Sequence, residues 1–216
     1  VNTNFNAYLP SSTTDAGGKT TNYSWSGSRF LLSKTTPAGT TSYTRNSLGQ
    51  ALTVTRPDGL VRTHTYDTLG RLLTITESAA GFPSRTTTHT RDAAGRVTRT
   101  TYPDGSYEDF TYDSLGLLTT VREKNGTYTV HTYDTTAGSP TAGLRLTSTR
   151  GLPAAGSDPA LGETTTHTWH LPGNASGSPA RTLASVTDPR GRTTAYEYDP
   201  AGRVVKTTYP DGSFRQ

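Results

Sequence analysis

The chain has 216 residues, of which 30% are hydrophobic, and its formal net charge of +4 comes from arginines and lysines spread along its length. This spread argues against nucleic-acid binding, which requires a basic stripe with stacking aromatic residues. The absence of cysteine excludes disulfides and thiolate metal sites. No apolar run approaches the roughly 20 residues that a membrane-spanning helix needs.

Threonine is the most frequent residue, with 45 copies, and glycine and proline recur between short apolar stretches. Because threonine is β-branched, it fits well on half-exposed strand surfaces. We therefore predict an all-β fold built from tandem β-hairpins. The sequence begins at Val1 without a methionine and stops at Gln216 just after a turn, so we expect a processed piece or a fragment of a longer protein.

A short motif recurs along the chain, and its copies align on one position that we name the anchor. A unit of about 21 residues occurs in about eight copies over residues 18–216, with insertions near 77–88, 135–162 and 172–180. Residues 1–17 are expected to be an N-terminal lead-in. The anchors are Trp25, Arg45, Tyr66, Arg91, Tyr112, Tyr133, Trp169 and Tyr198.

Each anchor is followed by residues that favour a tight turn. Aspartate comes one position later in five copies, glycine four positions later in six, and arginine directly after that glycine in three. Aspartate bonds its own backbone in turns, and glycine allows the positive φ that such turns need. The predicted structural turn residues are Asp67, Gly70, Arg71, Asp92, Gly95, Arg96, Asp113, Gly116, Asp134, Asp199, Gly202 and Arg203.

A second turn signal follows the next strand. It reads PDG at 57–59, 103–105 and 210–212, and KNG at 124–126. Proline is favoured at the second position of a β-turn, and glycine supplies positive φ. Seven residues separate the glycine of this turn from the next anchor in six copies. Each unit is therefore predicted to be a strand, a turn, a second strand and a second turn.

Two residues before each anchor lies an aromatic or imidazole ring. Positions i and i−2 share one face of a strand, so these rings are expected to form a ladder that packs across strands and supplies a core. Four of the five histidines occupy this position, but phenylalanine and tyrosine replace them freely, which a metal-ligand position would not allow. No metal or other cofactor is predicted. The ring ladder is Tyr23, Tyr43, His64, His89, Phe110, His131, His167 and Tyr196.

Two features depart from the regular unit. Arginine replaces the aromatic anchor at Arg45 and Arg91, and long surface loops are expected over 152–162 and 172–180. Irregular loops of repeat proteins often carry specific recognition. Recognition and a simply tolerated insertion both remain open, and the second is the simpler explanation.

The string YDxxGR, followed by a strand, PDG and seven residues to the next tyrosine, resembles the YD repeats of RHS proteins. These repeats are found in bacterial polymorphic toxins, insecticidal toxin complexes and animal teneurins. The resemblance covers the chain from about Gly18 to Gly212. It implies an antiparallel β-sheet strip that spirals as part of a shell, in a secreted or cell-surface protein. The shell would encapsulate or display a toxin or effector domain.

Catalysis is not predicted. The letters DPRG at 188–191 match a self-cleavage signature of some RHS proteins, but Asp188 and Gly191 fit the ordinary second turn and Asp199 fits the next first turn. The repeated aspartates are separated by whole units, and no phosphate loop, nucleophile elbow or metal motif is present. The chain is therefore predicted to be structural and not an enzyme.

Two other functions remain as alternatives. Trp25 and Trp169 would be the candidates to stack on sugar rings of surface glycans, although both occupy anchor positions and are better explained as core residues. Unpaired strand edges at the ends of the strip would allow self-association into a filament.

Overall fold

The computed structural model describes residues 2–6 and 9–216, with side chains described from Leu9 onward, and it confirms the predicted all-β class. These residues form nineteen strands and one short 3-10 helix. No helix among them has the length and apolar character needed to span a membrane. The chain divides into two compact units, Val1–Ser106 and Tyr107–Gln216, which are described in turn.

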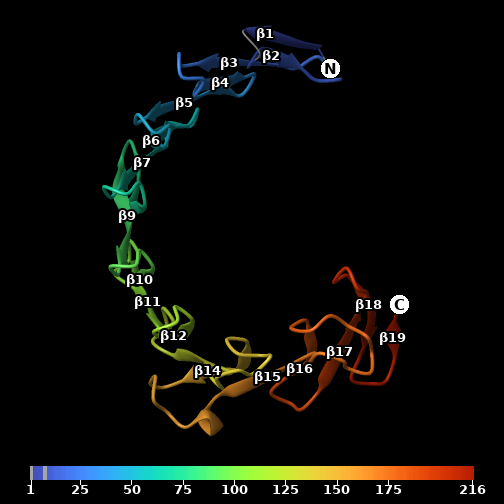
Figure 1. Ribbon diagram of the computed structural model, residues 1–216. Coiled ribbons are helices and arrows are strands. Elements are labelled where there is room, and N and C mark those ends of the chain that lie inside the picture. Colours follow the sequence, from blue (N-terminus) through green and yellow to red (C-terminus); the bar gives the residue numbers. More distant parts are fainter. Residues whose placement is uncertain (1, 7–8) are drawn as a thin grey trace. The chain divides into compact units, whose positions relative to one another are not determined.

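In the first unit each strand pairs antiparallel with the next one along the chain, as the blue-to-green succession in Figure 1 shows. This order follows from the short turns, because a two- to five-residue connection can only join antiparallel neighbours. The strands are β1 (Asn2–Asn6), β2 (Leu9–Thr14), β3 (Thr20–Trp25), β4 (Leu31–Thr36), β5 (Gly39–Arg45), β6 (Ala51–Thr55), β7 (Val61–Tyr66), β8 (Leu72–Ala79), β9 (Phe82–Arg91) and β10 (Val97–Thr101).

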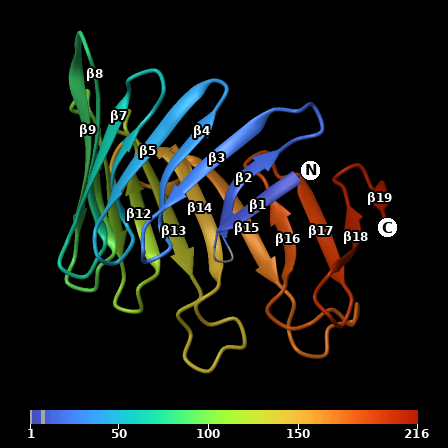
Figure 2. The same ribbon diagram turned by 90° about the horizontal axis from the view of Figure 1, so that it is seen from above.

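The second unit repeats this arrangement, with each strand again antiparallel to the next. Figure 2 shows two long loops leaving the same end of its strands, after β13 and after β15. The elements are β11 (Tyr107–Tyr112), β12 (Leu118–Arg122), β13 (Tyr128–Tyr133), β14 (Arg145–Leu152), the 3-10 helix η1 (Pro159–Leu161), β15 (Glu163–Trp169), β16 (Leu183–Thr187), β17 (Thr193–Tyr198), β18 (Val204–Thr208) and β19 (Phe214–Arg215).

The expected lead-in and the first insertion are both built from strands. Residues 2–6 and 9–14 pair as β1 and β2, and β2 pairs onward with β3, so strand pairing begins ahead of Gly18. The extra residues near 77–88 lengthen β8 and β9 to 8 and 10 residues, with Gly81 in their connection. An insertion of this kind lengthens a hairpin without disturbing the register of its neighbours.

One face of the strands carries the anchors and the residues two positions before them, and we name it the ring face. In β3 and β5 the residues of this face are half-buried, and the residues between them are exposed. The eight predicted ladder residues are all half-buried. Among the described residues Leu152 is the one buried hydrophobic side chain. The expectation of a packed core was therefore wrong. In a single layer of hairpins, each side chain is covered by its neighbours within the sheet but not by a second layer above it.

The opposite face is held together by hydroxyl groups. The residue just before the anchor bonds a hydroxyl on the neighbouring strand, as in Thr44–Thr53 at 2.6 Å, Thr65–Thr74 at 2.7 Å and Thr132–Thr147 at 2.7 Å. Cross-strand hydroxyl pairs of this kind each contribute roughly 0.2–1 kcal/mol to a sheet. The abundance of threonine is thus explained by lateral pairing.

Candidate functional site

The turn after the anchor is closed by its aspartate. In the copy at 67–71, Asp67 Oδ1 accepts hydrogen bonds from the backbone N–H of Leu69 at 2.9 Å and of Arg71 at 2.8 Å. Asp67 Oδ2 accepts from Arg71 Nε at 2.6 Å. Gly70 has a φ of 78°, a left-handed conformation that favours glycine. Both carboxylate oxygens are therefore occupied inside the turn.

Four turns share this arrangement of aspartate with the arginine four residues later. The aspartate Oδ2 lies 2.6–2.7 Å from the arginine in the pairs Asp67–Arg71, Asp92–Arg96, Asp188–Arg192 and Asp199–Arg203. Hydrogen bonds from the arginine backbone and side chain lower the pKa of all four carboxyl groups. The DPRG sequence thus contains an ordinary turn aspartate, with both oxygens bonded.

Two predicted turn aspartates lack this arginine partner. Asp113 Oδ1 still accepts from the backbone N–H of Leu115 and Leu117, at 2.9 and 2.8 Å. Asp134 accepts instead from the hydroxyls of Ser139 and Thr141, the latter at 2.6 Å, and these bonds lower its pKa. The turn at Asp134 closes through Gly143, whose N–H donates to the Asp134 carbonyl at 2.7 Å.

The anchor side chain links its hairpin to the preceding one. Tyr66 Oη donates to the carbonyl of Ala51 at 2.9 Å, and Tyr133 Oη donates to that of Leu118 at 2.7 Å. Ala51 is the first residue of β6 and Leu118 is the first residue of β12, so in both cases the acceptor begins the second strand of the preceding hairpin. The same reach is made by Trp25 to Pro10, Arg45 to Leu31, Arg91 to Leu72 and Trp169 to Arg145, at 2.7–3.0 Å.

The acceptor carbonyl lies at a β-bulge. In all eight hairpins that the anchors begin, the strand register shifts at the anchor. A bulge places two residues of one strand opposite one of its partner and interrupts the ladder. The next anchor bonds the backbone there. Arg45 and Arg91, which the sequence presents as departures, carry the N–H groups that make the same link as tyrosine or tryptophan.

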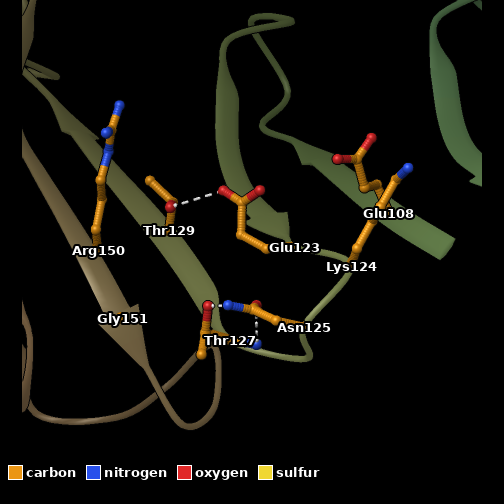
Figure 3. A pocket seen from close by; sticks show the side chains of 8 residues that line it. All are labelled: Glu108, Glu123, Lys124, Asn125, Thr127, Thr129, Arg150 and Gly151. Carbon is orange, nitrogen blue, oxygen red and sulfur yellow. Dashed lines mark hydrogen bonds between the residues drawn. The ribbon is translucent and has the colours of Figure 1, made fainter. Parts of the chain in front are cut away.

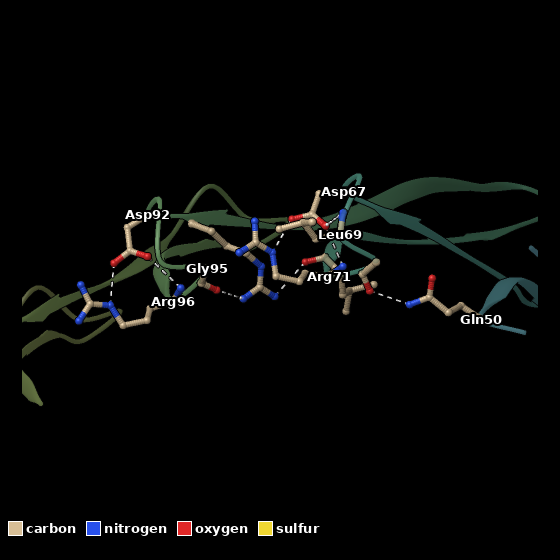
Figure 4. A network of polar contacts seen from close by, with 10 residues as sticks. Gln50, Asp67, Leu69, Arg71, Asp92, Gly95 and Arg96 are labelled. Atoms are coloured by element: carbon tan, nitrogen blue, oxygen red, sulfur yellow. Dashed lines mark hydrogen bonds and ion pairs between the residues drawn. The ribbon is translucent and has the colours of Figure 1, made fainter. Parts of the chain in front are cut away.

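The turn glycines also permit close contact between copies. The residue after the positive-φ position of one turn lies against the turn glycine of the next copy. Phe30 follows Arg29, whose φ is 63°, and a Cβ at Gly49 would come within 2.4 Å of the Phe30 ring. Figure 4 shows the continuation, in which Gln50 Nε2 donates to the carbonyl of Gly70 at 2.6 Å. A Cβ at Gly95 would lie 2.0 Å from Arg71 Nη1. Sequence reasoning missed this contact because it assigned the glycines to positive φ alone.

The ring ladder is polar at several positions. The Tyr23 and Trp25 ring centroids are 6.2 Å apart, and the Arg45 guanidinium lies 5.3 Å from the Tyr43 ring centroid. The Nδ1 atoms of His64, His131 and His167 are buried without a hydrogen-bond partner. Burial lowers the pKa of these three histidines and of His89, and that of His131 falls to about 4. These rings are therefore uncharged at neutral pH.

The remaining ladder residues show no common chemistry. His89 Nδ1 lies 3.1 Å from the Thr100 hydroxyl, and Phe110 and Tyr196 are half-buried opposite Val121 and Thr207. Within the described residues no group of three His, Asp or Glu side chains is placed to hold a metal ion.

The two loops of the second unit that follow β13 and β15 are tied together. Arg181, with a φ of 67°, donates to the carbonyls of Pro140 at 2.9 Å and Ala142 at 3.2 Å. Ser178 is 4% exposed and its hydroxyl accepts from the N–H of Tyr198 at 2.9 Å. Both loops are thus anchored to the framework.

The loop from Leu152 to Gly162 closes against its own strand. Asp158 caps η1 by accepting from the N–H of Ala160 at 2.9 Å. A Cβ at Gly162 would lie 2.9 Å from Leu152, which is 1% exposed. This loop therefore covers the one buried leucine.

A polar hollow of about 650 Å³ lies over β12 to β14, at the second-turn end of the second unit. Figure 3 shows Glu123 and Thr129 joined by a hydrogen bond, with Arg150 extending from β14 beside them. Gly151 has a φ of 78° and sits at a register shift opposite β13. The hollow is lined by Glu108, Glu123, Lys124, Asn125, Thr127, Thr129, Arg150 and Gly151.

Comparison with known proteins supports the repeat assignment. The RHS Repeat family model matches residues 45–81 and 181–213. No curated protein matches the sequence. The chain resembles the Tc holotoxin pore of Photorhabdus luminescens, solved with a mutant TccC3, at 16% identity and a TM-score of 0.60, covering 96% of this chain and 13% of that one.

Two crystal structures give lower scores. TcdB2-TccC3-TEV matches at 16% identity and a TM-score of 0.40, covering 92% of this chain and 14% of the other. TcdB2-TccC3 matches at 15% identity and a TM-score of 0.35, covering 93% and 15%. The chain therefore spans only a small part of each solved structure. Residues 45–81 and 181–213 therefore match the RHS repeat, and the chain shares the fold of the matching part of the holotoxin.

Proposed function

We propose that this RHS-repeat chain is a segment of wall that encapsulates or displays another domain, such as a toxin or effector, in a secreted or cell-surface protein. The observation that carries the proposal is the bond to the preceding hairpin that six of the eight anchors make, with three kinds of side chain. Such links set the position of each hairpin on the last, which a wall of repeats requires.

The carboxylates support a structural role and not a catalytic one. Those of Asp67, Asp92, Asp188 and Asp199 each accept backbone and arginine hydrogen bonds within their own turns. A general acid or base needs a free oxygen within hydrogen-bond reach of a substrate. We therefore infer that the repeated aspartates hold turns and that the segment has no enzymatic activity of its own.

The tryptophans are assigned to the sheet in this proposal. The indole N–H groups of Trp25 and Trp169 are bonded to the carbonyls of Pro10 and Arg145 at 2.8 and 2.7 Å. Both side chains are half-buried. A sugar-stacking tryptophan presents an open ring face, so these contacts favour the wall over the glycan-binding alternative.

The proposal is tested by small-angle X-ray scattering and protease protection on the natural protein that carries this chain. We expect a pair-distance distribution weighted toward long distances, as a hollow particle gives, and a protected domain that becomes cleavable when the wall is unfolded. A solid or rod-like profile, with every domain cleaved at the same rate in the native protein, would contradict enclosure.

A further inference from the structure

A second hollow on the ring face of the second unit contains polar groups that nothing in the repeat uses. It has a volume of about 350 Å³ and lies over β14 and β15. Ser148 lies opposite His131 on β13 and Thr165 on β15, which places all three side chains on one face. The hollow is lined by Arg145, Ser148, Arg150, Glu163, Thr165, His167 and Pro189.

The floor of this hollow carries two hydroxyls without partners. Ser148 is 8% exposed, and neither its hydroxyl nor that of Thr165 has a hydrogen-bond partner among the described residues. The adjacent pair on the opposite face, Thr149 and Thr164, bonds at 2.9 Å. Because these hydroxyls make no bond within the sheet, both can donate to a ligand that reaches the floor of the hollow.

Two guanidinium groups border the same floor and also lack acceptors. The Arg145 Nε atom is buried without a partner, and the Arg145 guanidinium lies 5.9 Å from the Tyr133 ring centroid. Arg150 is exposed and makes no ion pair or hydrogen bond within the described part of the chain. By contrast, Arg45 and Arg91 on the ring face of the first unit each bond two backbone carbonyls.

The charges around the hollow limit what it can hold. Arg145 and Arg150 contribute two positive charges, and Glu163, which faces Arg150 across the strands, contributes one negative charge. His167 is uncharged at neutral pH, because burial and then Arg145 lower its pKa. A site with a net charge of about +1 fits a single negative charge better than a doubly charged group.

We propose that this hollow is a carboxylate-binding site, in which Arg145 and Arg150 pair with the carboxylate and the hydroxyls of Ser148 and Thr165 donate to its oxygens. Guanidinium groups are suited to carboxylates because both are planar and form paired hydrogen bonds. The carboxylate can belong to a free organic acid or to an acidic side chain of a polypeptide held against the ring face. The site does not depend on the proposed wall function.

The test is a titration of the full chain with acetate at pH 7 and constant ionic strength, followed by NMR of the histidine ring protons. We expect a saturable shift of His167, an apparent dissociation constant at least 5-fold weaker for Arg150→Gln, and an unchanged constant for Arg56→Gln. Arg56 is an exposed arginine of the first unit, so this control removes the same charge outside the hollow. Ser148→Ala should weaken binding at least 2-fold.

Two further arms identify the source and specificity of the ligand. A capped glutamate peptide that binds while its glutamine counterpart does not assigns the site to acidic side chains, and binding of acetate alone assigns it to free acids. Phosphate, which is more highly charged at pH 7, should bind more weakly than acetate. Shifts that grow linearly, that chloride reproduces, or that are equal in Arg150→Gln and Arg56→Gln would overturn the proposal.

Discussion

The indole Nε1 of Trp169 lies 2.7 Å from the backbone carbonyl of Arg145, the residue that pairs with Tyr133 at the bulge of the preceding hairpin. The two residues are 24 positions apart, because the long strand β14 and the loop between β14 and β15 lengthen this copy. Tyr66 and Ala51 make the same contact over 15 positions. The bond between copies is therefore preserved even where the repeat length changes.

Removing one anchor hydroxyl should weaken the sheet measurably. Tyr66→Phe keeps the ring but leaves the Ala51 carbonyl without its partner, so we expect the free energy of unfolding to fall by about 1 kcal/mol. Urea unfolding measures this change. Tyr209→Phe is the matched control, because Tyr209 is 42% exposed and lies outside the anchor position; an equal loss in both variants would contradict the role of the anchor bond.

Anchor residues should be interchangeable when they keep a donor. Arg45 donates to the carbonyls of Leu31 and Gly49, each at 2.8 Å. Arg45→Tyr should retain the bond to Leu31, and its free energy of unfolding should stay within about 1 kcal/mol of the parent value. The free energy of unfolding of Arg45→Leu should fall by about 2 kcal/mol. Thermal and urea unfolding of the two variants compare them directly. Equal stability of the tyrosine and leucine variants would show that packing, and not the bond, matters.

Two glycines with the same backbone conformation should respond differently to alanine. Gly49 and Gly59 have φ of 80° and 81°, but a Cβ at Gly49 would meet the Phe30 ring at 2.4 Å, whereas one at Gly59 meets nothing within 4 Å. Gly59→Ala should cost about 1–2 kcal/mol from the left-handed backbone alone. Gly49→Ala should lower the free energy of unfolding by roughly a further 1–3 kcal/mol, because the added methyl group overpacks against the ring.

A double-mutant cycle checks the origin of this difference. Phe30→Ala should recover most of the additional loss in Gly49→Ala and none of the loss in Gly59→Ala. If Phe30→Ala is additive with Gly49→Ala, the ring is not the group that excludes a side chain at Gly49.

Acid should destabilise the second unit through His131. Burial, followed by the charges of Arg145, Arg150 and His167, lowers the pKa of His131 to about 4. The unfolded side chain titrates near pH 6.5, so the unfolded state binds the proton first, and the free energy of unfolding falls between about pH 6.5 and 4. We expect His131 to contribute roughly 1–2 kcal/mol to this fall, after its solvent exposure is discounted.

His131→Phe should flatten that part of the pH profile, because Phe110 occupies the same ladder position in another copy. The turn aspartates also have lowered pKa values, but their stabilisation is lost only below about pH 4, where the unfolded carboxyls take up protons first. Unfolding curves at pH 7, 5.5 and 4.5 separate the two effects. An unchanged slope in His131→Phe would rule out this histidine as the cause.

The loops after β13 and β15 should loosen together when their clamp is removed. Arg181→Gly retains a residue that accepts the positive φ of 67° and removes the bonds to Pro140 and Ala142. We expect faster hydrogen exchange and proteolysis within 136–142, with little change in global unfolding. Arg190→Gly, at an exposed arginine of another turn, should leave that loop unchanged.

Much of the architecture could be predicted from local chemistry. Asp67 and Gly70 mark a turn because aspartate bonds nearby backbone N–H groups and glycine accepts positive φ, and both effects act within five residues. The alternation around Tyr23 and Trp25 indicates a half-buried strand for a similar reason. Strand, turn and hairpin order therefore follow from the sequence alone.

Only the tertiary structure decided how the copies contact one another. The bond from Trp25 to Pro10, the contact of Phe30 with Gly49 and the unpaired groups around Ser148 each bring together residues from different strands or turns. Their positions depend on the bulges that set the register. The sequence showed Arg45 and Arg91 as exceptions because it displays residue type, not the acceptor that a side chain reaches. Likewise, the sequence suggested a packed core that the single layer does not provide. Burial of a sheet face depends on what packs against that face, which the residue types on the face do not reveal.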